Sequence, residues 1–221
     1  MAASVDAGAT AIICLQETKL STITAPTGYQ VTHVARKSRA GGGIATLVPH
    51  FMHVLATNTH EYYVHVQLAV STGVLHVINV YIPPRCNKPD HLVWGYLLQL
   101  LDSIPVNEPV VLVGDFNAHL GSSSAPCPLH GETRAPLLGG TCGRGRLLQV
   151  TLDARDMNVL NGCAHVQPYT CTTLQRGGTV VRSTVDYLIV NSEALRYVHS
   201  IAIQDHPPRR TSKNYHAHLV M

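Results

Sequence analysis

The sequence has few charged residues and lacks the local signals of several protein classes. Only 13% of its 221 residues are charged and 45% are apolar, which argues against a disordered chain and supplies enough apolar side chains for a large core. There is no run of 18 apolar residues and no basic segment leading into an apolar one, so neither a transmembrane helix nor a secretory signal is predicted. No repeat or linker is visible, which favours one domain over residues 1–221.

None of the six cysteines forms a C-x-x-C pair, the spacing typical of zinc and redox sites. Cys127-Pro-Leu-His130 and Cys163-Ala-His165 resemble halves of a zinc site, but their spacings do not combine into one. We therefore expect reduced cysteines that mainly pack in the interior of an intracellular protein. The formal net charge of +3 is compatible with a polyanionic partner but too small to argue for one.

The motif with the most chemical content is VVLVGDFN, over residues 110–117. Its apolar residues predict a short buried strand, and Gly114 lets the chain turn so that Asp115 and Asn117 lie just past the strand's C-terminal end. In layered α/β proteins, sites form at that edge. A carboxylate there can accept a proton or face a metal, and an amide can donate to a phosphate oxygen. A plain Asp-x-Asn turn explains the same residues equally well.

Four more polar residues fall at or near the ends of predicted strands. Glu17 follows the apolar run 11–15, Tyr81 ends the run 74–82, Asp186 lies in the run 184–190, and His216 precedes the closing residues. Each has an ordinary explanation, such as an exposed turn residue or a buried side chain with a satisfied hydrogen bond. For Asp186, the sharper interpretation is a carboxylate that orients a histidine.

Other segments give a coarse secondary structure. Periodic apolar residues predict helices over 90–104 and 144–157, and residues 62–70 and 74–82 form a predicted hairpin around Ser71-Thr72-Gly73. Further strands are predicted at 44–48, 159–160, 179–181 and 198–203, the end of a helix at 1–10, and a long irregular loop at 121–143.

Taken in order, LQET (15–18), VYIP (80–83), GDFN (114–117) and VDY (185–187) resemble the motifs of the endonuclease/exonuclease/phosphatase superfamily. The form GDFNAH, the helix start RGRLL (144–148) and the LNG at 160–162 are similar to the apurinic-type endonuclease domain of non-LTR (LINE-like) retrotransposons. The resemblance covers essentially the whole chain. It implies an α/β (α+β) fold: a four-layered sandwich of two packed, mostly antiparallel sheets flanked by helices.

The resemblance also implies a divalent metal, Mg²⁺ with Mn²⁺ as the alternative, held by Glu17 against a phosphate oxygen. The substrate would be DNA, cut in one strand at a target site, and Thr170 falls where the retrotransposon enzymes contact their DNA. The resemblance further implies an intracellular, nuclear monomer without a membrane partner, and a full-length element that would carry a reverse transcriptase.

Catalytic roles follow from the same resemblance. Asp115 would align or deprotonate the attacking water, and Asn117 and Tyr81 would hold or stabilise the phosphoryl group. His216, oriented by Asp186, would stabilise the developing charge. One hard cation on carboxylate oxygen, with fixed donors around an in-line displacement, is what this chemistry needs.

The sequence departs from the family pattern at both ends. The family's first strand carries an asparagine beside the metal, and Met1 falls inside the helix that follows that strand, so we expect the first strand to be missing. The closing Ser-Asp-His of the family appears as Asn214-Tyr215-His216, which keeps the histidine and loses its acidic neighbour. Asp205-His206 has the family's pair, but Pro207 follows instead of a strand. We therefore favour His216 over His206, in a strand beside the one that holds Asp186.

Three functions remain open from the sequence. The first is a Mg²⁺-dependent DNA-nicking endonuclease, impaired by the truncation. The second is a phosphatase of the same superfamily, disfavoured by the GDFNAH motif. The third is a catalytically dead remnant that at most binds nucleic acid.

Overall fold

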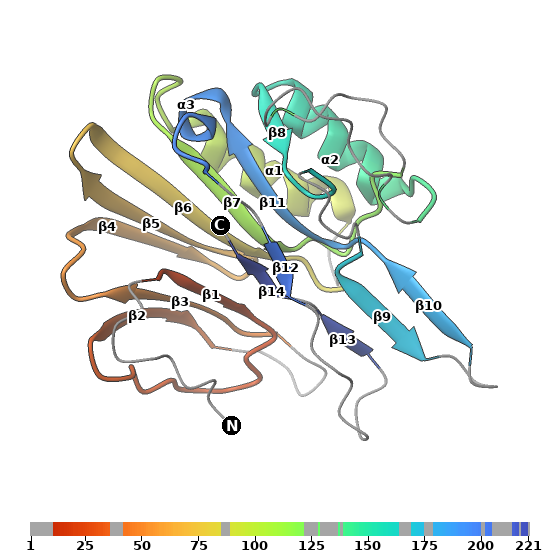
Figure 1. Ribbon diagram of the computed structural model, residues 1–221, viewed down its shortest axis with the longest axis horizontal. Coiled ribbons are helices and arrows are strands. Elements are labelled where there is room, and N and C mark those ends of the chain that lie inside the picture. Colours follow the sequence, from red (N-terminus) through yellow and green to blue (C-terminus); the bar gives the residue numbers. More distant parts are fainter. Residues whose placement is uncertain are drawn as a thin grey trace.

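The computed structural model describes residues 11–35, 42–84, 89–121, 128, 137, 139–163, 169–174, 179–199, 202–204, 214–216 and 218–220. Its largest sheet has six strands, which are β4 (Val54–His60), β5 (Tyr63–Val70), β6 (Gly73–Tyr81), β7 (Val110–Asp115), β11 (Asp186–Asn191) and β8 (Met157–Val159). They are arranged in that spatial order (Figure 1). Neighbouring strands run antiparallel except β6 and β7, which are parallel.

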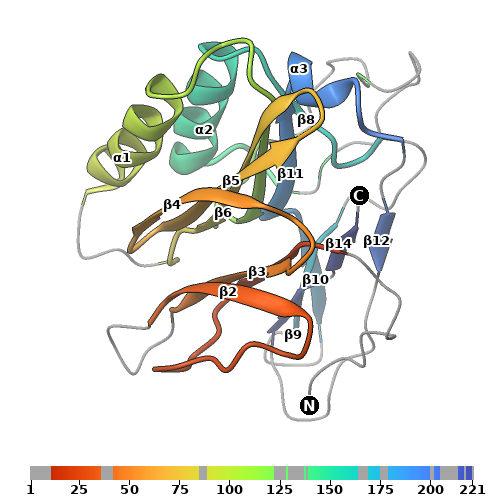
Figure 2. The same ribbon diagram turned by 90° about the vertical axis from the view of Figure 1, so that its left-hand side faces the viewer.

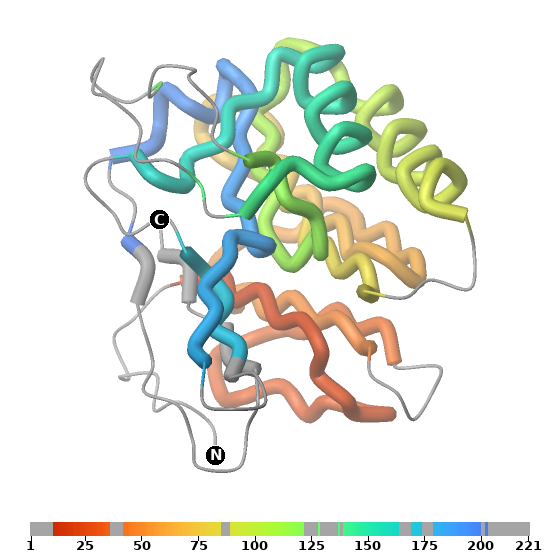
Figure 3. Tube along the Cα trace, turned by 90° about the vertical axis from the view of Figure 1, so that its right-hand side faces the viewer, coloured from red at the N-terminus to blue at the C-terminus, as the bar shows by residue number. Residues whose placement is uncertain are grey.

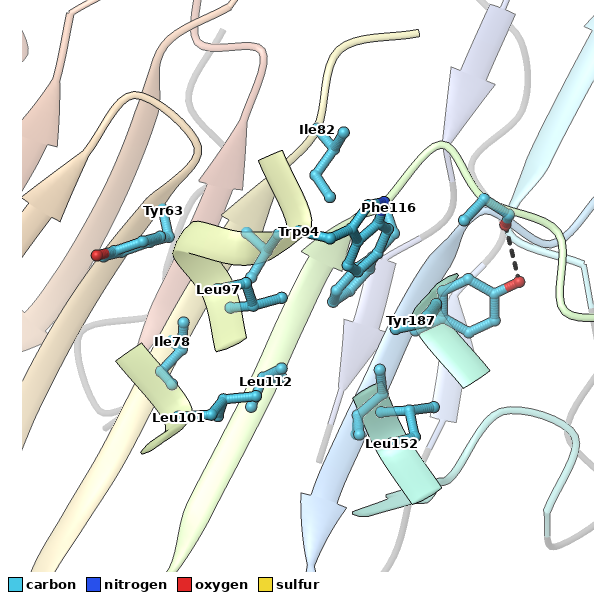
Figure 4. Packing of buried hydrophobic residues seen from close by; sticks show 14 of the residues in the cluster. Tyr63, Ile78, Ile82, Trp94, Leu97, Leu101, Leu112, Phe116, Leu152 and Tyr187 are labelled. Atoms are coloured by element: carbon cyan, nitrogen blue, oxygen red, sulfur yellow. Dashed lines mark hydrogen bonds between the residues drawn. The ribbon is translucent and has the colours of Figure 1, made fainter. Parts of the chain in front are cut away.

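Two helices, α1 (Asp90–Asp102) and α2 (Gly143–Asp153), cover one face of this sheet (Figures 2 and 3). Helix α1 connects β6 to β7, because parallel neighbours need a crossover connection. Figure 4 shows Trp94 of α1 beside Phe116, with Tyr187 of β11 further along the same layer. The largest core cluster of the described residues therefore lies between these helices and the sheet.

The opposite face of the sheet is covered in two parts. A three-stranded sheet, in the order β1 (Ile13–Gln16), β3 (Ile44–Pro49) and β2 (Tyr29–Val34), packs on β5 and β6 through a second apolar cluster that includes Ile44, Val64 and Tyr81. Helix α3 (Ser192–Leu195) packs on β7 and β11 nearer the other end. The two sheets and the helices form stacked layers (Figure 2).

Two smaller sheets lie beside this body (Figure 1). The first has the order β10 (Val180–Ser183), β9 (Cys171–Leu174) and β13 (Asn214–His216). The second pairs β12 (Ala202–Gln204) with β14 (His218–Val220).

The expected architecture of packed sheets flanked by helices is confirmed, as are the hairpin of β5 and β6 and the strand β7. Helix α2 ends at Asp153 and not at 157, because Met157 already pairs with β11 in strand β8. The predicted helix end at 1–10 and much of the predicted loop at 121–143 lie outside the described residues. Within the described part, no helix covers the outer face of the three-stranded sheet and none is long and apolar enough to cross a membrane.

A buried chain of polar groups runs across the helix-covered face of β5 and β6. Nε2 of His65 lies 2.9 Å from Nδ1 of His76, and Nε2 of His76 lies 2.6 Å from a carboxylate oxygen of Glu108. Both imidazoles are buried. Burial, with a smaller contribution from the neighbouring His76, lowers the pKa of His65 from 6.5 to about 4.

We expect this chain to make the protein less stable in acid. Since the unfolded state takes up a proton on His65 near pH 6.5 and the folded state only near pH 4, the free energy of unfolding should fall as the pH drops through that window. The loss from this group is at most about 3 kcal/mol. Urea unfolding at pH 7.5 and 4.5 measures it. His65→Gln should flatten the pH dependence relative to the parent protein; equal slopes in the parent and the variant would contradict the assignment.

Candidate active site

Three of the predicted site residues lie side by side at one end of the six-stranded sheet, where β6 and β7 finish and β11 begins. Tyr81 is the last residue of β6 and is the register partner of Asp115, the last residue of β7. Asp186, the first residue of the antiparallel strand β11, is the other register partner of Asp115. Register partners on neighbouring strands point to the same face. All three side chains therefore share the face that carries the three-stranded sheet, and all three residues are buried.

Asp115 is held by the turn that follows it. One of its carboxylate oxygens accepts from the Asn117 backbone N–H, and the other accepts from the Asn117 side-chain amide, each at 2.9 Å. The same amide donates to the carbonyl oxygen of Ile82, and Asn117 adopts a left-handed backbone with φ +44°. The Asp-x-Asn turn and the candidate site are thus the same structure. Both amide hydrogens of Asn117 are occupied, so donation to a phosphoryl oxygen would require one of these bonds to open.

Glu17 approaches the same end of the six-stranded sheet from the three-stranded sheet. It follows β1 with φ +49°, and the N–H of the next residue, Thr18, donates to the Gly43 carbonyl at the start of β3. The Tyr81 hydroxyl donates to a carboxylate oxygen of Glu17 at 2.7 Å. Tyr81 therefore links Glu17 of one sheet to the position next to Asp115 of the other. The side chain of Glu17 is 40% exposed, so this end of the site is open to solvent.

Asp186 is positioned through its backbone by two buried polar residues. The Thr170 hydroxyl accepts from the N–H groups of Val185 and Asp186, at 3.2 and 3.0 Å. Asn161 continues along the same side of the strand, because its amide donates to the Asp186 carbonyl and its oxygen accepts from the Leu188 N–H. Thr170 is only 1% exposed, so in this structure it supports β11 from within. A contact of Thr170 with DNA stays a prediction.

His216 is not in a strand beside β11, contrary to expectation. It ends β13, which pairs with β9, and its register partner is Cys171, the residue after Thr170. The closing strand β14 pairs with β12. The reason is that β7 and β8 occupy the two edges of β11, and Asn161 seals the part that β8 does not reach. His206 lies outside the described residues, so the choice between the two histidines stays a prediction.

Sequence reasoning missed the buried amides that join these parts. Asn79 in β6 and Asn161 after β8 are both fully buried and bond to backbone groups of other strands. The available signal was an amide inside or beside an apolar run, which is costly unless it is hydrogen-bonded.

The oxygen donors at Glu17 fit a hard divalent cation. The Lys19 ammonium lies 3.3 Å from the Glu17 carboxylate, so a metal bound there would replace Lys19 as the partner of this carboxylate. No cluster of three or more His, Cys, Asp or Glu side chains suited to a metal occurs among the described residues. Mg²⁺ accepts a ligand set in which one protein carboxylate is completed by water and substrate oxygens. A metal ion that needs several protein ligands does not accept such a set.

Several solved structures share the fold of this chain. Among solved structures, the endonuclease domain of TRAS1, a telomere-specific non-LTR retrotransposon, aligns with a TM-score of 0.60 at 20% identity over 80% of this chain and 73% of that one. An AP endonuclease from Archaeoglobus fulgidus aligns with a TM-score of 0.60 at 18% identity, over 94% and 86%. The 3′ phosphatase NExo from Neisseria, bound to a product DNA hairpin, gives 0.60 at 16% identity, also over 94% and 86%. At these identities the likeness concerns the fold.

A search of curated proteins found no match. The model of the endonuclease/exonuclease/phosphatase family, however, matches residues 2–212, which include every candidate site residue named above except His216. The chain belongs to the endonuclease/exonuclease/phosphatase family.

Proposed function

We propose that this chain is a Mg²⁺-dependent DNA endonuclease that hydrolyses a phosphodiester bond in one strand. The observation that carries the proposal is the hydrogen bond from Tyr81 to Glu17. It joins the solvent-exposed carboxylate of Glu17, next to the three-stranded sheet, to Tyr81 in the six-stranded sheet. Asp115 and Asp186 are buried beside each other at the same end of that sheet. This arrangement supports a site that takes its metal ligand from one part of the fold and its base from another.

Bound at Glu17, Mg²⁺ would neutralise negative charge on the phosphate and polarise its P–O bonds. Asp115 serves as the base that aligns a water and takes its proton, since the turn at Asn117 fixes both carboxylate oxygens. Tyr81 holds Glu17 in place through its hydroxyl. Preorganised groups of this kind need no rearrangement during the reaction, which is the main source of their catalytic effect.

Asp186 and His216 complete the proposed site. The pairing of β13 with β9 brings the backbone of His216 next to the residue that follows Thr170, and Thr170 bonds to the backbone of Asp186. In the proposal, Asp186 orients His216, and this histidine stabilises the charge that develops on the phosphoryl oxygens. Thr170 remains the residue that we propose to lie near the DNA. It would act through the start of β11, whose backbone its hydroxyl holds.

The GDFNAH motif and the fold shared with a retrotransposon endonuclease domain support an origin in a non-LTR element. We propose target-site nicking as the biological role, with the chain acting as a monomer on nuclear DNA beside a reverse transcriptase of the same element.

The test is a nicking assay on supercoiled plasmid with the 221-residue protein. We expect conversion to the open-circular form in Mg²⁺, and none when EDTA replaces the metal. Release of phosphate from a 3′-phosphorylated duplex is followed in parallel, because a solved neighbour of this fold is a 3′ phosphatase. Phosphate release without nicking would identify a phosphatase. Neither activity, from protein that melts cooperatively, would identify a non-catalytic remnant.

A further inference from the structure

Asn79 in β6 contacts several polar groups between the two sheets. It is completely buried. Its amide nitrogen lies 2.9 Å from the carbonyl oxygen of Ala45 and 3.2 Å from the hydroxyl of Thr46, both in β3, and 3.3 Å from the carbonyl oxygen of Leu15 in β1. Its oxygen accepts from the side-chain amide of Gln16 at 2.5 Å. One residue of the large sheet therefore contacts two strands of the small one.

This link lies directly behind the candidate site. Asn79 precedes Tyr81 by two residues and points to the same face of β6, because side chains alternate along a strand. Gln16 immediately precedes Glu17. Two cross-sheet hydrogen bonds therefore run in parallel, Asn79 with Gln16 inside the core and Tyr81 with Glu17 at its edge.

Among the described residues, only Asn79 bonds to the Gln16 side chain, and beyond Gln16 the backbone N–H groups of Thr18 and Lys19 still bond to the carbonyls of Gly43 and Gly42. Gln16 is the last β1 residue paired with β3, opposite Ile44, and Glu17 then takes a left-handed backbone. The backbone bonds at Thr18 and Lys19 tie this segment to the small sheet, whereas the bond between Gln16 and Asn79 ties it to β6, so the position of Glu17 relative to Asp115 depends on how β1 sits on β6. A buried amide with all its bonds made costs free energy to displace, because its partners would also lose theirs.

We infer that Asn79, acting through Gln16, is a positioning residue that sets the place of the Glu17 carboxylate and thereby the affinity of the site for a divalent cation. This inference rests on the proposed metal site at Glu17. Groups that orient a metal ligand typically change metal affinity by about 10- to 100-fold when they are removed.

The experiment measures Mn²⁺ binding by the electron paramagnetic resonance signal of the free ion, so it does not depend on nicking. Gln16→Met keeps the length of the side chain and removes the donor, at a half-buried position where the fold tolerates change better than at Asn79. We expect its Kd for Mn²⁺ to rise about 10-fold. In the nicking assay, the Mg²⁺ concentration for half-maximal rate should rise by a similar factor, with little change in the rate at saturating Mg²⁺.

Gln30→Met is the matched control. Gln30 lies in β2 of the same small sheet, and its amide donates to the Met52 carbonyl at 3.2 Å. This variant loses one half-buried amide bond, as Gln16→Met does, but not the one behind Glu17. It should match Gln16→Met in melting temperature and match the parent in Mn²⁺ affinity. Asn79→Leu, alone and combined with Gln16→Met, forms a double-mutant cycle in which the two changes should not add.

The outcomes separate this inference from the proposed function. An unchanged Kd in folded Gln16→Met, or equal Kd changes in Gln16→Met and Gln30→Met, would overturn the role of Asn79. A parent protein that binds no Mn²⁺, or binds it equally well as Glu17→Gln, would also overturn it. A parent that binds Mn²⁺ through Glu17 but does not nick DNA would refute the endonuclease alone, and the Kd of Gln16→Met would still decide the inference.

Discussion

Replacing Asp115 with alanine is expected to reduce plasmid nicking at least about 10³-fold, in the range of losses seen when a general base is removed. The fold should survive, but the protein should melt at a lower temperature. Both carboxylate oxygens accept from Asn117, and these two bonds are lost together. A cost of about 1–3 kcal/mol is usual when buried partners are left unpaired. The carboxylate thus has a structural role as well as a chemical one.

Asn191→Ala is the control for that structural cost. Asn191 ends β11 at the far end of the same strand pair, where its side-chain oxygen accepts from Val110 and Ala194 N–H groups. Its loss should lower the melting temperature by a comparable amount and leave nicking intact, when both variants are assayed well below their melting temperatures. An Asp115→Ala protein that retained more than about a tenth of the parental Mg²⁺-dependent rate would remove Asp115 from the proposed mechanism.

The second large effect is expected at Gly114, whose backbone in β7 packs directly against that of Val80 in β6. Gly114 has φ +142°, and a Cβ at this position would overlap the backbone carbonyl of Val80 on the neighbouring strand. The obstacle is main chain, so no rotamer change can relieve it. Gly114→Ala should cost roughly 4 kcal/mol, from backbone strain and overpacking combined, or prevent folding altogether.

Thermal melts and urea unfolding measure this cost, with Gly95→Ala as the comparison. Gly95 lies inside helix α1, and an added Cβ would meet nothing within 4 Å. Alanine there should stabilise the protein by about 0.5–1 kcal/mol, because glycine loses more chain entropy in a helix. Replacement of glycine by alanine is thus expected to lower the free energy of unfolding at position 114 and to raise it at position 95. A Gly114→Ala protein as stable as the parent would mean that β6 and β7 are not packed as described here.

Where Gly114→Ala does fold, nicking should fall with stability. Gly114 is the register partner of Val80, and the next register pair along the two strands is Tyr81 and Asp115. Separation of the strands at the first pair displaces the second, so the Tyr81 hydroxyl would move away from its bond with Glu17.

The amino-acid sequence by itself determined the elements that have a strong local pattern. The apolar run before Asp115 forms β7, the periodic residues after Pro89 form α1, and the turn at Ser71-Thr72-Gly73 joins β5 and β6. These depend on side-chain periodicity and turn chemistry over a few neighbouring residues, which can be read along the chain. The same local patterns placed Glu17, Tyr81 and Asp115 at strand ends, whereas the roles expected for them came from the resemblance to the family.

Strands without such a pattern were not predicted. β4 and β2 are the outermost strands of their sheets, and β4 in particular has mostly exposed side chains. An edge strand is held by main-chain hydrogen bonds to one neighbour, and these leave little mark on its composition.

Tertiary structure alone decided which of the polar residues meet. Asp115 lies between Tyr81 and Asp186 because β7 pairs with β6 on one side and with β11 on the other, and Glu17 reaches Tyr81 because the small sheet packs on β6. The strand of His216 pairs with β9 because no edge of β11 is free for it. Such pairings join segments that are far apart in sequence, and their free energy depends on which partner each strand edge finds. No local period of the chain records that choice.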